Sequence, residues 1–102
     1  MACANLFDLT GHVAVVTGGN SGIGRSVGLG LAQAGAAVAV LARNEEKNQR
    51  VLGELKALGG RAFVLGVDVT VRGQLQPALA QVEETLGPVS ILVNNAGTGV
   101  FG

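Results

Sequence analysis

The stretch TGGNSGIG, residues 17–24, decides the fold predicted for this chain. An apolar run at 13–16 precedes it, and the segment at 25–34 that follows has the pattern of a helix. Strand, glycine-rich turn and helix in this order are the context in which such a loop binds a nucleotide. Backbone without side chains can approach a pyrophosphate, and the helix N-terminus behind it offers N–H groups and a favourable dipole. The sequence therefore predicts a phosphate-binding loop at 17–24.

Apolar strand-like segments and helical segments alternate along the rest of the chain. Strands are predicted at 12–17, 37–42, 61–67 and 89–94, and helices at about 22–34, 44–58 and 74–86. The second strand is apolar throughout, which is typical of a strand covered on both faces. This βαβαβαβ order predicts an α/β fold with a doubly wound parallel sheet, right-handed crossovers and the strand order 3-2-1-4.

The helical patterns also predict where helices begin and which faces are buried. Asn44 can cap the second helix, and Pro77 is tolerated only in a first turn, so the third helix should begin near 74–76. The apolar stripes consist of Ile23, Val27, Leu31 and Ala34 in the first helix, and of Val51, Leu55 and Leu58 in the second.

The composition indicates one small domain over residues 1–102, with 48% hydrophobic and 14% charged residues. Seven basic and seven acidic residues cancel, so nucleic acid is not an expected partner. Cys3 is the only cysteine, which excludes a disulfide framework within the chain, and no metal site is predicted. Residues 1–10 lack a secretory pattern, and the longest apolar run, 36–42, is too short to span a bilayer. We therefore expect a cytoplasmic protein without membrane association.

The end of the second predicted strand carries a signal about the cofactor. An NAD-binding site usually places a carboxylate here on the ribose hydroxyls, whereas an arginine can bind the 2′-phosphate of NADP. The chain has Ala42 followed by Arg43, so we predict NADP as the cofactor, with NAD as the second choice. The alternative is a surface arginine at a helix start, and the nearby Glu45 and Glu46 would weaken phosphate affinity.

Two further signals follow the third and fourth predicted strands, where ligands bind in such sheets. Asp68 can accept a hydrogen bond from an adenine amino group, while a backbone N–H of Val69 meets a ring nitrogen; alternatively, Asp68 merely starts a turn. The stretch NNAG, residues 94–97, supplies asparagines that do not titrate, and Ala96 and Gly97 let the chain pass close to a cofactor.

The motifs TGGNSGIG, DV and NNAG, in this order and spacing, resemble the N-terminal half of short-chain dehydrogenases/reductases. The likeness extends from residue 7 to about 97, and is strongest to bacterial 3-oxoacyl carrier-protein reductases and sugar or polyol dehydrogenases. It implies a Rossmann-type fold and hydride transfer between a nicotinamide cofactor and an alcohol or carbonyl substrate. It also implies that Asn94 lies near the cofactor ribose and that Asn95 braces the sheet. The expected cofactor-binding residues are Gly18, Asn20, Ser21, Gly22, Ile23, Gly24, Arg43, Asp68, Val69, Asn94, Ala96 and Gly97.

The catalytic residues of that family have no counterpart here. The family uses a tyrosine whose pKa is lowered by a lysine, with a serine that orients the substrate. This chain has no tyrosine, and its two lysines, Lys47 and Lys56, fall on the second predicted helix. We therefore predict no catalytic residue, and expect a chain truncated before the catalytic half and inactive by itself. Its fourth strand would be an unpaired edge that favours self-association.

Other functions fit the motifs less well. The chain could be a non-catalytic nucleotide-binding or interaction module that has lost the catalytic half. A methyltransferase-like use of the same fold is disfavoured, because NNAG has no role there. A P-loop nucleotidase is excluded, because no G-K-[ST] follows the glycines.

Overall fold

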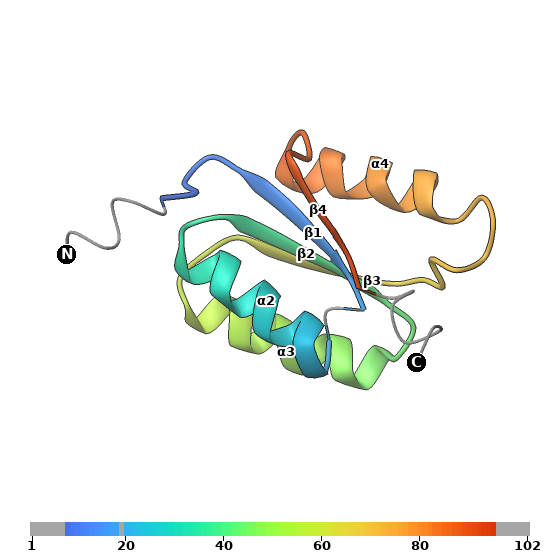
Figure 1. Ribbon diagram of the computed structural model, residues 1–102, viewed down its shortest axis with the longest axis horizontal. Coiled ribbons are helices and arrows are strands. Elements are labelled where there is room, and N and C mark those ends of the chain that lie inside the picture. Colours follow the sequence, from blue (N-terminus) through green and yellow to red (C-terminus); the bar gives the residue numbers. More distant parts are fainter. Residues whose placement is uncertain (1–7, 19, 96–102) are drawn as a thin grey trace.

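Four parallel strands form one sheet in the order β3-β2-β1-β4. The structure is a computed structural model that describes residues 8–18 and 20–95. Its strands are β1 (Val13–Thr17), β2 (Ala37–Ala42), β3 (Ala62–Gly66) and β4 (Ile91–Asn94). Its helices are α2 (Gly22–Gln33), α3 (Glu45–Ala57) and α4 (Leu75–Leu86) (Figure 1). The predicted α/β class, element order and strand order are confirmed.

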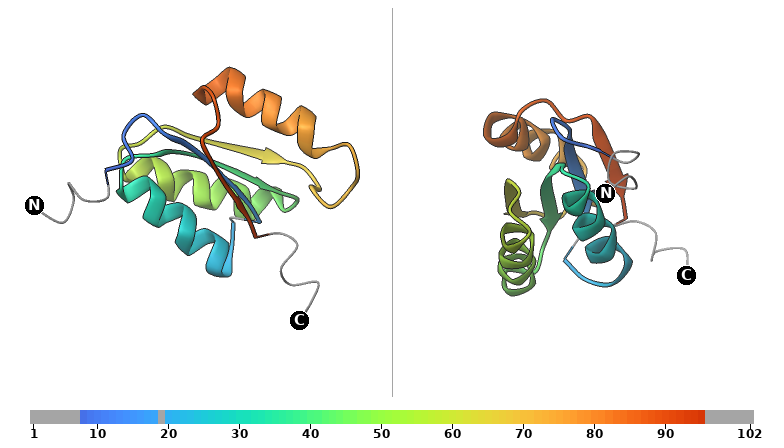
Figure 2. Two further views of the ribbon diagram at one scale, coloured as in Figure 1. Left: turned by 45° about the horizontal axis from the view of Figure 1, so that its top comes forward. Right: turned by 90° about the vertical axis from the view of Figure 1, so that its left-hand side faces the viewer.

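The sheet lies between two helical layers, with α2 and α3 on one face and α4 on the other (Figure 2). Successive strand residues point to opposite faces, so Ala14 and Val16 pack with α2 and α3, whereas Val13 and Val15 pack with α4. Every residue of β1 is buried. Each fully buried valine or leucine contributes about 1.5–3 kcal/mol to stability. The apolar central strands therefore form the core that holds both layers.

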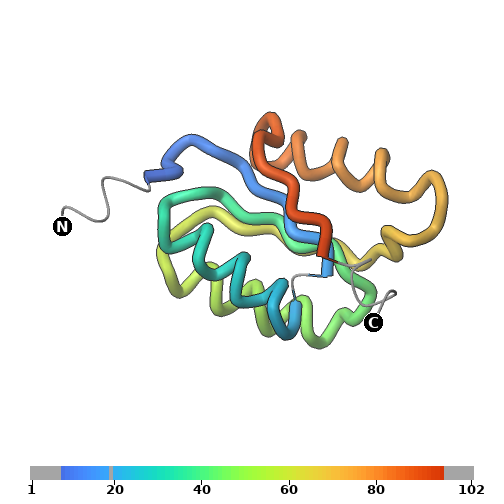
Figure 3. The backbone as a smooth tube through the Cα atoms, in the orientation of Figure 1, coloured from blue at the N-terminus to red at the C-terminus, as the bar shows by residue number. Residues whose placement is uncertain are grey.

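The register of the strands brings their carboxyl ends to one edge of the sheet. Thr17 at the end of β1 pairs with Leu41 in β2 on one side and with Asn94 in β4 on the other. Ala42 pairs in turn with Gly66 at the end of β3. The tube in Figure 3 shows the chain turning at this edge after β2 and after β3. Segments far apart in the sequence therefore meet there.

The helix α2 buries a different stripe from the predicted one. Its buried residues are Gly24, Gly28 and Ala32, whereas the side chain of Ile23 is 78% exposed. A Cβ added to Gly28 would lie 3.8 Å from Val38 Cγ1, so the helix approaches the sheet closely along its smallest residues. The prediction was wrong for Ile23, because apolar periodicity does not show which surface lies opposite the helix. Val27 and Leu31 are half-buried, and Leu31 packs against the core as predicted.

The other helices agree better with the predictions. Asn44 caps α3, and Pro77 lies in the first turn of α4, which begins at Leu75. In α3, Val51 and Leu55 are buried as predicted, but Leu58 is the C-cap and is 41% exposed, because the helix ends before it. Within the described ranges, no helix is long and apolar enough to cross a membrane.

The strand β4 is an edge of the sheet in the described part of the chain. Leu92 pairs in register with the fully buried Val15, and so lies on the face that carries α4. Leu92 is nevertheless 51% exposed, because α4 packs over the other strands (Figure 2).

Candidate functional site

The loop after β1 has an open helix N-terminus behind it. Gly18 turns the chain with a φ of 67°, and its N–H donates to the Leu41 carbonyl at 2.9 Å. Ser21 is the N-cap of α2, with an extended φ of −159°, but its side chain makes no capping hydrogen bond. The first turn of α2 contains no acidic residue. The helix N–H groups and its positive dipole end are therefore available to an anion.

Gly24 is needed for packing inside this loop. It is buried, and a Cβ at this position would collide with the Gly18 carbonyl and lie 2.6 Å from Asn95 Nδ2. The first turn of α2 can therefore lie directly against the loop only because residue 24 is glycine. Its predicted contact with a cofactor stays a prediction.

The end of β4 is tied to the same loop through side chains. The Thr17 hydroxyl donates to Asn94 Oδ1 at 3.0 Å, and the Asn95 N–H donates to the Thr17 hydroxyl at 2.9 Å. Asn95 Nδ2 also donates to the Gly18 carbonyl at 3.3 Å. Asn95 thus braces the loop against the sheet. Ala96 and Gly97, also predicted for the site, lie outside the described residues.

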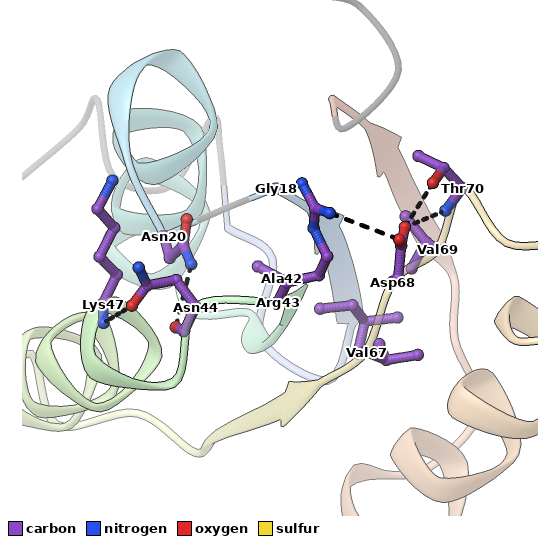
Figure 4. Close-up of a pocket in the computed structure, with 11 residues that line it drawn as sticks. Gly18, Asn20, Ala42, Arg43, Asn44, Lys47, Val67, Asp68, Val69 and Thr70 are labelled. Carbon is purple, nitrogen blue, oxygen red and sulfur yellow. Dashed lines mark hydrogen bonds and ion pairs between the residues drawn. The ribbon is translucent and has the colours of Figure 1, made fainter.

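A cavity of about 510 Å³ opens beside this loop, at the ends of β1, β2 and β3 (Figure 4). Its lining residues are Gly18, Asn20, Leu41, Ala42, Arg43, Asn44, Lys47, Val67, Asp68, Val69 and Thr70. Five predicted residues from three separate loops, Gly18, Asn20, Arg43, Asp68 and Val69, therefore meet in one cavity. The predicted Ser21, Gly22, Ile23, Gly24 and Asn94 are not among its lining residues.

Asp68 lies on one wall of the cavity as an ionised carboxylate. The Thr70 hydroxyl and the Thr70 N–H both donate to Asp68 Oδ1, the latter at 3.0 Å. These hydrogen bonds, with a smaller contribution from the Arg43 guanidinium, lower the pKa of Asp68 below its usual value. Asp68 Oδ2 lies 3.7 Å from Arg43 Nη1. Asp68 therefore does start a turn, as the alternative interpretation held, while its second oxygen pairs with Arg43 (Figure 4).

The charges around the cavity favour an anion more than the sequence suggested. Two cations, Arg43 with a side chain 78% exposed and Lys47, and one anion, Asp68, line it, whereas Glu45 and Glu46 do not. The Glu45 carboxylate is directed toward β3 instead, since a Cβ on Gly66 would come within 2.6 Å of its Oε2.

Sequence reasoning missed the buried Asn48 of α3. Its Nδ2 donates to the Ala42 carbonyl at 2.9 Å, and its Oδ1 accepts from Asn20 Nδ2 at 3.0 Å. Asn48 precedes Val51 by three residues and Leu55 by seven, which places a polar residue on the inward stripe of an amphipathic helix. A polar residue on this inward stripe is the sequence signal that could have revealed the role of Asn48.

Comparison with known proteins agrees with this geometry. The family described as short chain dehydrogenase matches residues 12–102. A short chain dehydrogenase of Pseudocercospora fijiensis is 48% identical over 94 residues, covering 92% of this chain and 30% of that protein. The crystal structure of a dehydrogenase/reductase from Sinorhizobium meliloti 1021 is 38% identical with a TM-score of 0.88, covering 94% of this chain and 38% of that one.

The L-sorbose reductase from Gluconobacter frateurii, solved in complex with NADPH and L-sorbose, is 34% identical with a TM-score of 0.84. The match covers 90% of this chain and 35% of the reductase. The chain thus spans about a third of the length of these relatives. The matched residues include the glycine-rich loop and every residue that lines the cavity. The chain therefore belongs to the short-chain dehydrogenase/reductase family.

Proposed function

We propose that this chain is the dinucleotide-binding part of an oxidoreductase that transfers a hydride between a nicotinamide cofactor and an alcohol or carbonyl substrate. The observation that carries the proposal is the uncapped N-terminus of α2, with no acid in its first turn, next to a cavity of about 510 Å³. A cavity of this size suits the adenosine end of a dinucleotide, and the open helix end suits its pyrophosphate. The nicotinamide supplies the hydride chemistry when bound.

Each predicted residue has a role in this proposal. The loop from Gly18 to Gly24 holds the pyrophosphate through backbone N–H groups, with Asn20 and Ser21 at its centre and Ile23 exposed beside it. Asp68 Oδ2 accepts from the adenine amino group, and the Val69 backbone meets the ring. Asn94 lies toward the ribose, with Ala96 and Gly97 following. The chain has no tyrosine, so we assign the acid–base groups of the reaction to residues other than these 102.

NADP is the proposed cofactor, with NAD second. Two cations, Arg43 and Lys47, line the cavity, and Ala42 occupies the position where a carboxylate would select the unphosphorylated ribose. A 2′-phosphate would accept charge-assisted hydrogen bonds from Arg43 and replace its present pairing with Asp68.

Fluorescence titration of the chain with NADPH and NADH tests both parts of this proposal. We expect saturable binding of both, with the tighter affinity for NADPH. S-Adenosylmethionine, added as a competitor against bound NADPH, serves as the control ligand of a different enzyme class. Binding of S-adenosylmethionine in preference to either dinucleotide would contradict the proposal.

The alternative function is a non-catalytic nucleotide-binding or interaction module, and the specific observation that favours it is the edge strand β4 with its half-exposed Leu92. In either case we propose that the isolated chain self-associates through this edge. Sedimentation at several concentrations should show a mass that rises with concentration, and Leu92→Lys should reduce the rise. A stable monomer at all concentrations would rule out the self-association.

A further inference from the structure

We propose that the buried Asn48 is a positioning residue that holds the phosphate-binding loop in its binding shape through Asn20; this inference rests on the proposed function. Among the described residues, four hydrogen bonds tie residues 18–24 of the loop to the rest of the fold. Two of them reach only Gly18, whose N–H donates to the Leu41 carbonyl and whose carbonyl accepts from Asn95. The other two come from Asn20 in the middle of the loop, and the shorter of them is the bond to Asn48.

Asn48 uses both ends of its side-chain amide. It is fully buried, with Nδ2 donating to the Ala42 carbonyl at 2.9 Å and Oδ1 accepting from Asn20 Nδ2 at 3.0 Å. A buried amide is costly unless both ends are paired, so each partner constrains the orientation of the other. The Ala42 carbonyl, at the end of β2, thereby orients the Asn48 oxygen toward the loop.

The local fold does not need this amide. The Ala42 carbonyl already accepts from the Val67 N–H at 3.1 Å, so the end of β2 keeps a hydrogen bond without Asn48. Val51 and Leu55 continue the same buried stripe, so a leucine at position 48 would extend an apolar surface. Among the described residues, the other contact of Asn20 Nδ2 is a long one of 3.5 Å to the Asn44 carbonyl. What an asparagine at position 48 adds is therefore that it fixes the position of Asn20.

Holding Asn20 matters because the loop around it has little preference for a single shape. Gly18 and Gly22 both have positive φ, and glycine leaves many other conformations open. A loop that is already in its bound shape loses less conformational entropy on binding. Because the pyrophosphate is common to both cofactors, Asn48 should affect NADPH and NADH equally, whereas Arg43 should affect NADPH more.

The test compares Asn48→Leu, Asn20→Ala and the double variant in the whole chain. Backbone order parameters of residues 20–24, measured by NMR relaxation without ligand, should fall in each single variant, while those of β1 are unchanged. The dissociation constants for NADPH and NADH should both rise about three- to tenfold, the loss of one hydrogen bond. The double variant should bind the dinucleotides no more weakly than the single variant of lower affinity, because each single substitution already removes the same contact. Gln49→Leu, an exposed neighbour on the same helix, is the matched control and should change neither readout.

Several outcomes would overturn the inference. A folded Asn48→Leu variant with unchanged loop order parameters would do so, and so would losses that add fully in the double variant. If Asn48→Leu does not fold, Asn20→Ala alone decides, since unchanged order parameters of the loop in that variant exclude any hold through Asn20. If the unsubstituted chain binds neither dinucleotide, the proposed function fails, and the order parameters of the loop by themselves decide the role of Asn48.

Discussion

The helices α2 and α3 begin at the same edge of the sheet, yet their N-termini differ in chemistry. In α3, the Asn44 side chain accepts from the Lys47 N–H at 2.9 Å, and two glutamates occupy the first turn. In α2, the side chain of Ser21 makes no capping bond, and no acid follows it. A side-chain cap contributes about 0.5–2 kcal/mol, and each first-turn acid about 0.3–1 kcal/mol.

Under the proposed function, the difference divides one edge of the sheet between stability and binding. The start of α3 satisfies the Lys47 N–H with its own Asn44 side chain, and its two glutamates disfavour an anion. The start of α2 lacks these stabilising groups, and we propose that its N–H groups bind the pyrophosphate. The region of α3 lines the cavity with Arg43, Asn44 and Lys47, and Asn48 acts behind it through its hydrogen bond to Asn20.

The largest effect should come from disrupting the close contact between α2 and its loop. Gly24→Ala places a Cβ against the Gly18 carbonyl and Asn95, which should destabilise the fold by about 1–3 kcal/mol and abolish dinucleotide binding. Urea unfolding and fluorescence titration measure the two effects. Gly53→Ala in α3, where nothing lies within 4 Å, should instead stabilise by about 0.5–1 kcal/mol. If the two variants changed stability and dinucleotide binding alike, α2 and α3 would not differ as proposed.

Next in size is the contribution of the β2–α3 turn to cofactor choice. Arg43→Ala should weaken NADPH binding about 10- to 100-fold through the loss of charge-assisted hydrogen bonds, with little effect on NADH. Arg43→Lys keeps the charge but not the planar guanidinium, so its affinity for NADPH should lie between those of the unsubstituted chain and Arg43→Ala. Titration with both dinucleotides measures the selectivity. An equal loss for NADPH and NADH would refute the assignment of Arg43 to the 2′-phosphate.

A smaller effect is expected when α2 receives an acid like that of α3. Ile23 is the second residue of α2, as Glu46 is of α3, and its side chain is 78% exposed. Ile23→Glu should weaken the binding of both dinucleotides about tenfold, because the glutamate repels the phosphates. It should slightly stabilise the unliganded protein. Ile23→Gln controls for the lost apolar side chain. If the glutamate and glutamine variants bind equally, the end of α2 does not face the phosphates.

The smallest expected effects concern stability at the two caps. Asn44→Ala should destabilise the fold by about 0.5–2 kcal/mol, and Asn44→Ser should recover most of the loss. Ser21→Ala should change stability by less than about 0.5 kcal/mol, because that side chain makes no capping bond. Thermal and urea unfolding provide the comparison. A large loss at Ser21 would mean that α2 is capped after all.

Local patterns were sufficient for much of the fold and for part of the candidate site. The start of α4 follows from Pro77 and the cap of α3 from Asn44, because both depend on neighbouring backbone alone. The meeting of Gly18, Arg43 and Asp68 in one cavity follows from parallel strands that end at one edge. The buried face of α2 and the burial of Asn48 did not follow, because both depend on the surface opposite.

The sequence by itself determined the order of strands and helices and the glycine-rich loop, since hydrophobic period and turn residues act over short distances. The sheet topology followed from that order through the rules for doubly wound βαβ units. Only the tertiary structure decided that α2 approaches the sheet through Gly24, Gly28 and Ala32, and that Glu45 is directed away from the cavity. Only the tertiary structure likewise paired Asn20 with Asn48, across 28 residues of sequence. The physical reason is that close packing and side-chain hydrogen bonds depend on which surfaces meet, and a residue's neighbours in the chain do not specify that.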